Sequence, residues 1–293
     1  MKDIKELKAL IRLVDEPDEK LFNQVRNHIF DYGMDAVAEL EAACELTFDE
    51  TLQKRIIQLI HDIQMNNLYI ELNSWAKFNY TDLLQGYMLV SRYQNPDLNT
   101  DLITREIGRI AQEVWLELNN NLTALEKVKV INHILFDINK IVGNTTNLFS
   151  PDNFYLKNLF ESRKGNPLSI GMLYIIIARS LHIPIYGVDL PRHFILAYAD
   201  ETPMNDIKTD NEKETDILFY LNPFNRGAVF TKKEIELFVK QMNLDFQESF
   251  FKPCSNLTII KRMIEGLIET YRKNGNSIKA SELEYLIGAL QIT

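Results

Sequence analysis

The feature that most constrains this chain is a helix whose residues are apolar on every side. Asn166 and Pro167 make a strong helix start, because asparagine accepts hydrogen bonds from the first free backbone N–H groups and proline lacks an N–H that would be unpaired there. The residues that follow are almost wholly apolar to about position 182. A helix with no polar face has to be covered all round. The sequence therefore predicts a central buried helix from Pro167 to about His182.

Three extended segments follow this helix. Residues 183–188 enter a strand through a proline, His193–Ala199 form a second strand, and residues 217–221 form a third. The connection at 200–216 is polar, acidic and rich in turn residues, so we expect an exposed, mobile hairpin loop there. Packed on helices, these strands predict a short antiparallel sheet in an α+β fold.

Helical spacing of apolar residues covers most of the remaining chain. Residues 1–70 resemble a HEAT-type helical region, which is either a small cap packed on the next domain or a freestanding peptide-binding solenoid. Residues 236–293 resemble one tetratricopeptide-type hairpin, and a single unit is a lid or buttress rather than a groove. Thr123 and Glu126 match a capping box. We therefore expect a predominantly helical chain in three parts, with 71–235 between the two helical ends.

Composition limits the classes of function. Of the 293 residues, 46% are hydrophobic and 25% are charged, which is ordinary for a soluble globular protein. No apolar run is long enough for a transmembrane helix, and the charged N-terminus lacks the apolar region of a secretory signal, so a cytoplasmic location is expected. The net charge of −9 and the lack of a dense basic run argue against nucleic acid or a membrane surface as a partner.

The pattern of cysteine and histidine argues against metal chemistry. Cys44 and Cys254 are far apart and lack C-x-x-C spacing. We expect free, mostly buried thiols in a reducing cytoplasm, with a disulfide between them as the alternative. The five histidines are scattered and make no metal-binding pattern. The sequence therefore predicts no metal and no cofactor.

Three polar elements remain, and their order along the chain is informative. Arg163–Gly171 starts the buried helix, Arg192–Phe194 starts a strand with a histidine, and Asn222–Phe224 ends a strand with a side-chain amide. Papain-like and transglutaminase-like folds deliver a nucleophile, a base and an orienting group in this order. A cysteine in the first helical turn would have its pKa lowered by the positive end of the helix dipole.

The span from Gly165 to Tyr198 resembles the transglutaminase-like superfamily, and most of all its SirB-like bacterial branch, whose domain often lies beside tetratricopeptide repeats. The helical run from about 80 to 160 also resembles that branch. The implied core is a central helix packed on a small antiparallel sheet and flanked by helical hairpins. The residues that carry the resemblance are Arg163, Gly165, Asn166, Pro167, Ser169, Leu173, Tyr174, Ala178, Arg179, Leu181, Ile183, Pro184, Gly187, Val188, Pro191, His193 and Phe194, continued by Asn222, Pro223, Phe224 and Gly227.

The resemblance also implies site residues, position by position. The family's catalytic cysteine falls on Pro167, which offers no nucleophile. The family's histidine matches His193, and its aspartate falls on Asn222, whose amide can still orient an imidazole. Arg192 stands where the family commonly has glycine, so it would crowd or charge the mouth of the cleft, to which Asn166 also belongs.

Ser169 is the alternative nucleophile. Residues two apart on a helix point about 200° from one another. Ser169 should therefore face away from the side of Pro167 and bond the backbone of Asn166 or Pro167 as part of the cap. Water activated by His193 is a further alternative. His193 also has a purely structural interpretation, as a partly buried histidine at the start of a core strand that is bonded to Asn222.

Taken together, these patterns favour a non-catalytic transglutaminase-like protein that acts as a protein-interaction or regulatory scaffold and binds a protein or peptide. The alternative is a hydrolase or acyltransferase that uses Ser169 or an activated water with His193 and Asn222. A bacterial regulator acting through protein contacts is a third hypothesis, and it rests on the resemblance alone. No motif specifies a substrate or an oligomeric state.

Overall fold

The structure is a computed structural model that describes residues 4–200 and 216–291. Its contacts form two compact units, 1–71 and 72–293. The loop expected at 200–216 lies, apart from its two ends, outside the described residues.

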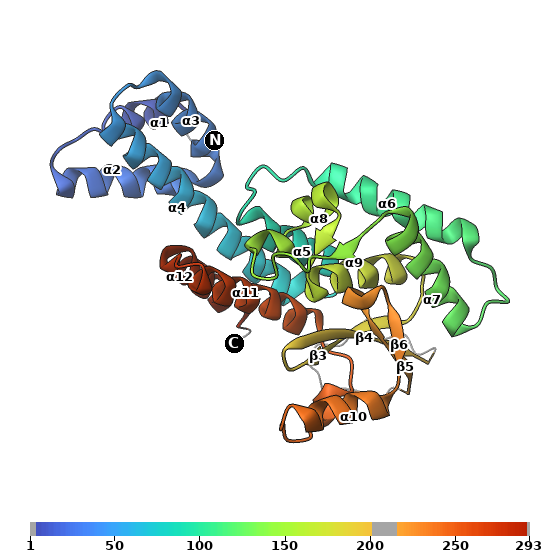
Figure 1. The fold of residues 1–293 in the computed structure, drawn as a ribbon. Coiled ribbons are helices and arrows are strands. Elements are labelled where there is room, and N and C mark those ends of the chain that lie inside the picture. The colour runs from blue at the N-terminus through green and yellow to red at the C-terminus, as the bar shows by residue number, and fades with distance from the viewer. Residues whose placement is uncertain (1–3, 201–215, 292–293) are drawn as a thin grey trace. The chain divides into compact units, whose positions relative to one another are not determined.

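The first unit consists of helices (Figure 1). They are α1 (Ile4–Ile11), α2 (Glu19–Tyr32), η1 (Gly33–Ala36), α3 (Val37–Leu46) and α4 (Glu50–Ser74), the last of which ends in the second unit. The core is aliphatic and includes Leu7, Val14, Ile29, Leu40 and Ile63, each at most 1% exposed. The helical periodicity of this region is confirmed, and its HEAT-like character stays a prediction.

The second unit begins with further helices. In chain order they are η2 (Trp75–Asn79), α5 (Leu83–Arg92), α6 (Thr100–Glu117), α7 (Ala124–Asn132), η3 (His133–Ile138), η4 (Pro151–Phe154) and α8 (Leu156–Ser162). The segments η2 and η3 are π-helical. Two short parallel strands, β1 (Val142–Gly143) and β2 (Lys164–Gly165), pair within this part. The capping box at Thr123 and Glu126 is confirmed at the start of α7.

The central helix of the second unit is α9 (Pro167–Ser180). Every residue from Leu168 to Ala178 is buried, as the absence of a polar face requires. The predicted buried helix is therefore confirmed. It ends two residues early, and His182 lies in the following turn with φ 57°.

The sheet of the second unit has four antiparallel strands in chain order: β3 (Ile185–Leu190), β4 (His193–Ala199), β5 (Ile217–Asn222) and β6 (Ala228–Phe230). The three predicted strands are confirmed, and β4 has the predicted bounds. The sequence did not predict β6, because three residues between turns carry too short a pattern. The one-turn helix η5 (Pro223–Asn225) connects β5 to β6.

Helices cover both faces of this sheet, with α9 on one side and α10 (Lys232–Gln241) on the other (Figure 1). A Cβ placed on Gly171 of α9 would lie 2.7 Å from the ring of Phe194. Ile195 instead belongs to a core cluster with Ile235 and Val239 of α10. Since successive residues of a strand point to opposite faces, the even-numbered residues of β4 face α9 and the odd-numbered ones face α10.

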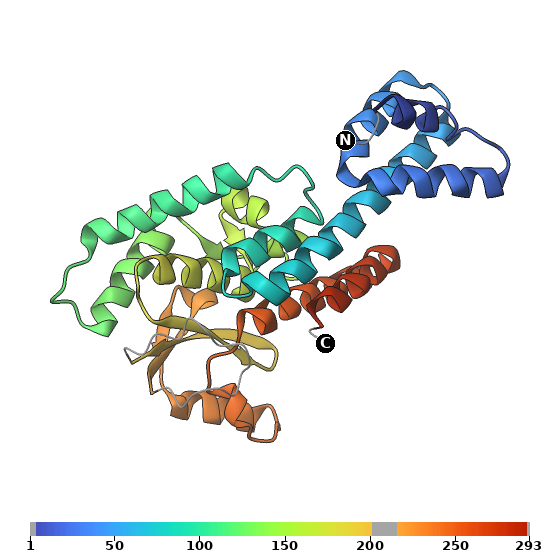
Figure 2. The same cartoon turned by 180° about the vertical axis from the view of Figure 1, so that it is seen from behind.

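A helical hairpin ends the chain (Figure 2). After η6 (Glu248–Phe250) come α11 (Asn256–Lys273), α12 (Ser277–Ile287) and η7 (Gly288–Leu290). The predicted helix pair is confirmed, and α11 also contacts α5 and β3. Residues 236–293 lie within the second compact unit, and the tetratricopeptide-like character of this hairpin stays a prediction.

Three observations on the described residues bear on the expectations from composition. No described helix is both long and apolar enough to cross a membrane. In residues 4–200 and 216–291, no group of three acidic, cysteine or histidine side chains is arranged to hold a metal ion. Cys44 and Cys254 form no disulfide with each other in this structure, which excludes that alternative.

Candidate functional site

The start of α9 is closed by a reciprocal cap. Asn166 Oδ1 accepts a hydrogen bond from Ser169 N at 2.8 Å, and Ser169 Oγ accepts one from Asn166 N at 3.0 Å. The Ser169 hydroxyl also donates to Asn166 O at 3.2 Å. Ser169 is 0% exposed, so its hydroxyl is enclosed by the cap that it completes. The expectation that Ser169 bonds the backbone of the cap is confirmed.

The imidazole of His193 lies on the face of the sheet that α10 covers. Its ring centroid is 4.6 Å from that of Phe238, with the two rings perpendicular. Partial burial in this contact lowers the pKa of His193. The residue of β4 that faces the first turns of α9 is instead Phe194, whose ring fills the space over Gly171.

Asn222 ends β5 and starts η5. Its Oδ1 accepts hydrogen bonds from the backbone N–H groups of Phe224 and Asn225, both at 3.1 Å. This local use satisfies the carbonyl half of the amide. The adjacent Pro223 lies 3.4 Å from the position of a Cβ on Gly171, so η5 is close to the first turns of α9.

The structure thus brings some of the predicted site residues together and leaves others apart. Asn166, Pro167 and Ser169 form one helix cap. Within the described chain, no hydrogen bond links the imidazole of His193 to Ser169 or to Asn222. The assembled triad remnant expected from the resemblance therefore stays a prediction without a recorded contact to support it.

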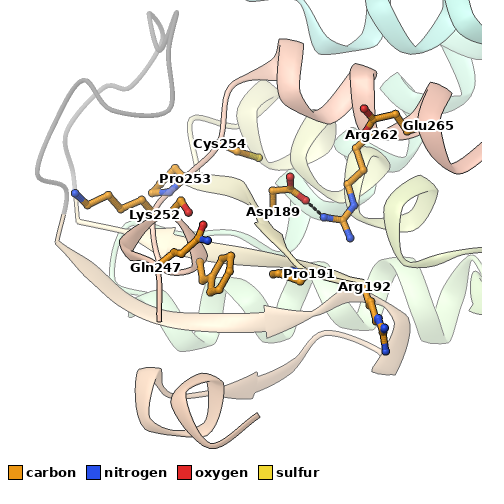
Figure 3. Close-up of a pocket in the computed structure, with 11 residues that line it drawn as sticks. Asp189, Pro191, Arg192, Gln247, Lys252, Pro253, Cys254, Arg262 and Glu265 are labelled. Atoms are coloured by element: carbon orange, nitrogen blue, oxygen red, sulfur yellow. Dashed lines mark ion pairs between the residues drawn. The ribbon is translucent and has the colours of Figure 1, made fainter. Parts of the chain in front are cut away.

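Arg192 is the second residue of the tight turn between β3 and β4, where its φ is 62°. It lines a pocket of about 350 Å³ together with Asp189 and Pro191 of the same hairpin, Phe250 and Cys254 of the segment before α11, and Arg262 of α11 (Figure 3). The resemblance implied that Arg192 would crowd or charge the mouth of a cleft. It did not indicate this pocket, whose walls are far apart in the chain.

Arg262 fixes the hairpin that carries Arg192 and His193. Its guanidinium pairs with Asp189, toward which it points in Figure 3. Its Nη2 also donates hydrogen bonds to Leu190 O at 3.1 Å and to His193 O at 2.9 Å. Burial lowers the pKa of Arg262 to about 10. The only sequence signal for this role is a cation within the apolar stripe of α11.

A second polar cluster, also unpredicted, surrounds η5. Asp137 of η3 contacts both His133, at 3.3 Å, and Arg226. The hydrogen bond from His133 and the charge of Arg226 lower the pKa of Asp137. The neighbouring Asn132 donates to Gly227 O at 3.1 Å, which ties α7 to the turn after η5. These contacts hold the turn in place.

Comparison with known proteins identifies relatives in bacteria and animals. The chain is 26% identical over 195 residues to a UPF0162 protein of Xylella fastidiosa strain 9a5c, a match that covers 64% of each chain. It is 23% identical over 192 residues to a UPF0162 protein of Vibrio cholerae, covering 64% of this chain and 65% of the relative. The human F-box only protein 21 is 23% identical over 271 residues, which is 84% of this chain and 41% of that protein.

The chain matches only part of each of these relatives, between 41% and 65% of their lengths. No solved structure matches it. The family model described as "Transglutaminase-like superfamily" matches residues 101–265, which is more than half of the chain and includes α9, the sheet and most of α11. This chain belongs to the transglutaminase-like superfamily.

Proposed function

We propose that this protein is a non-catalytic member of its family and serves as a protein-interaction or regulatory scaffold. One observation carries the proposal: the hydroxyl of Ser169, the side-chain nucleophile nearest in sequence to Pro167, is buried and bonded within the helix cap. Pro167 itself occupies the position that the resemblance assigns to the family's cysteine. The helix start therefore presents no reactive side chain.

The arrangement of the other two residues supports the same proposal. A general base has to lie within hydrogen-bond reach of the group that it activates. His193 packs against Phe238 on the α10 face, whereas the ring of Phe194 covers Gly171 on the α9 face. The Asn222 carbonyl accepts two hydrogen bonds from the backbone of η5, which gives the amide a local structural use.

Exposed apolar side chains favour an interaction role over a purely structural one. In the first unit, Leu46 at the end of α3 is 81% exposed, and Phe48 in the connection to α4 is 98% exposed. Large exposed apolar side chains can mark contacts with other proteins where they form a patch.

The test compares two thiols introduced at the helix start, Pro167→Cys and Pro167→Cys combined with His193→Ala. We expect both to react with iodoacetamide with the same apparent pKa, because the imidazole lies on the other face of the sheet. Peptide mapping by mass spectrometry separates this thiol from Cys44 and Cys254. A pKa that rises when the imidazole is removed would show a thiolate–imidazolium pair and contradict the proposal.

Unmodified protein provides the second arm of the test. Incubation with a fluorophosphonate probe should give no labelling of the wild-type chain, because the Ser169 hydroxyl is enclosed by its own cap. Labelling that disappears in Ser169→Ala would instead establish the alternative, a hydrolase or acyltransferase. Folding of each variant is checked by circular dichroism.

A further inference from the structure

The pocket of about 350 Å³ beside the β3–β4 turn, which we name the turn pocket, is built from three separate segments. Pro191 and Arg192 come from the turn, Phe250 and Pro253 from the segment before α11, and Arg262 from α11 itself (Figure 3). Its volume is within the range of pockets that hold small ligands or single side chains. It lies on the side of the hairpin held by Arg262.

Most of the charges around the turn pocket already have partners. Asp189 pairs with Arg262, Lys252 with Glu248 at 2.7 Å, and Glu265 with Lys261 at 3.7 Å. Arg192 differs from these residues. It is exposed, and no hydrogen bond or ion pair of its guanidinium is recorded within residues 4–200 and 216–291. One cation is therefore available at the rim of the turn pocket.

The backbone at Arg192 is unfavourable for its side chain. Its φ of 62° follows a proline in a two-residue turn, a pattern in which glycine or asparagine is preferred at the second position. A strained residue at an exposed turn is a reason to look for a role of its side chain. The unpaired charge of Arg192 and the adjoining turn pocket indicate that this role is to bind a ligand.

We propose that the turn pocket binds a short segment of a partner protein in which an acidic side chain stands next to an apolar one. The guanidinium of Arg192 pairs with the carboxylate, a match of fork and planar acceptor that arginine makes well. Pro191, Phe250 and Pro253 provide apolar walls for the neighbouring side chain. This inference rests on the proposed scaffold function and gives it a site and a kind of partner.

Charge selects among the classes of partner. The chain carries a net charge of −9, so it repels acidic molecules in general and nucleic acid in particular. A single unpaired arginine at the rim of a mainly polar pocket with a few apolar wall residues instead suits one carboxylate at one position. Gln247 and Ser249, which also line the turn pocket, offer further hydrogen-bond donors to such a group.

The test measures binding of the full chain to an immobilised array of eight-residue peptides, each with a central Glu-Leu or Glu-Phe pair. Each peptide is matched by one version with Gln in place of Glu and by another with Asn in place of the apolar residue. Binding of the best peptides is then measured by fluorescence polarisation. We expect each replacement to weaken binding by about tenfold, as the loss of a charged hydrogen-bonded pair or a buried apolar side chain requires. Arg192→Asn, which suits a positive φ, should weaken binding of the Glu peptides equally and leave that of the Gln versions unchanged.

Arg226→Asn is the matched control, because Arg226 is also an exposed arginine at positive φ, 51°, but lies after η5 and outside the turn pocket. Its variant should bind the Glu peptides as the wild type does. Glutarate in large excess should not displace a peptide, and displacement would mean that the pocket takes a free carboxylate. Equal binding of Glu and Gln peptides, the absence of any Glu-dependent peptide, or no effect of Arg192→Asn would each overturn the proposal.

The outcome also separates this inference from the proposed function. Labelling by the fluorophosphonate probe would refute the scaffold function whatever the peptides do. A failure of peptide binding with no labelling would refute only the turn pocket as the docking site.

Discussion

Arg262 and Arg192 show two different uses of the same side chain at one hairpin. Arg262 is largely covered, and its guanidinium pairs with Asp189 and donates hydrogen bonds to the carbonyl groups of Leu190 and His193. Arg192 sits at the tip of that turn with φ 62° and an exposed guanidinium. The first arginine therefore stabilises the hairpin, whereas the second is held by the hairpin and can serve a ligand.

At the residue scale, His193→Gln should make stability less sensitive to acid. Burial lowers the pKa of His193 below its usual value of about 6.5, so in that range the unfolded chain binds the proton more readily than the folded one. The wild type should lose stability as the pH falls through 6.5 toward the lowered pKa. Urea unfolding at about pH 7.5 and about pH 5.5 measures this loss, and an identical loss in the variant would contradict the assignment.

Side-chain direction is the part of the site that sequence reasoning could not supply. The pattern predicted the bounds of β4 and the helix cap because both are set by local residues. The face that His193 occupies depends on the register of the whole sheet against α9 and α10, and a shift of one residue exchanges the faces. The sequence therefore predicts that His193 starts a strand, but it does not predict which side chain the imidazole packs against.

At the element scale, the packing of α9 on the sheet depends on close approach at Gly171. The position of a Cβ there is 2.7 Å from the Phe194 ring, closer than van der Waals contact allows. The sheet and helix therefore touch where the helix has no side chain. Gly171 is thus required for this close packing, a role that was not predicted from the sequence.

A pair of Gly→Ala variants tests this contact. Gly171→Ala should destabilise the fold by roughly 1 to 3 kcal/mol through overpacking. Gly108→Ala is the matched control, because Gly108 lies in α6 and, apart from its own helical backbone and chain neighbours, no atom is within 4 Å of the added Cβ. The variant should stabilise the fold by about 0.5 to 1 kcal/mol through helix propensity. Chemical unfolding measures the change in stability of both variants. A loss of stability in both would show that the effect at Gly171 does not come from its contact with Phe194.

The whole molecule is organised around separate hydrophobic cores. The first unit has its own cluster of buried aliphatic residues, which includes Leu40 and Ile63. Both tryptophans of the chain, Trp75 and Trp115, belong to the second unit. Tryptophan fluorescence therefore reports the second unit, whereas far-ultraviolet circular dichroism reports both.

This distribution gives a prediction for Leu40→Ala, a truncation at a site with 0% exposure. It should cost the first unit about 3 kcal/mol through lost burial and the cavity left behind. The urea transition followed by circular dichroism should then begin at lower denaturant, while the fluorescence transition keeps its midpoint. Equal shifts in the two signals would mean that the units unfold as one.

The fold class and the family could be predicted because they depend on composition, on local periodicity and on two short motifs. Each motif, Gly165–Pro167 and Pro191–Phe194, lies within one continuous stretch of the chain. The turn pocket was not, because its walls come from positions around 190, 250 and 262. No periodic pattern links such segments. The pairing of β3 with β4 and the placing of η6 and α11 beside β3 bring them together.

The cap of α9 also bears on how this fold can change over generations. A thiol at position 167 would need a base on its own side of the sheet, yet the residue there is Phe194, and the first-turn donors are engaged by Asn166 and Ser169. A single substitution of Pro167 by cysteine would therefore place a thiol in the helix cap without a base beside it. Under the proposed non-catalytic function, Pro167 and the Asn166–Ser169 cap keep the helix start closed, and sequence change should be tolerated mainly at the surface of the molecule.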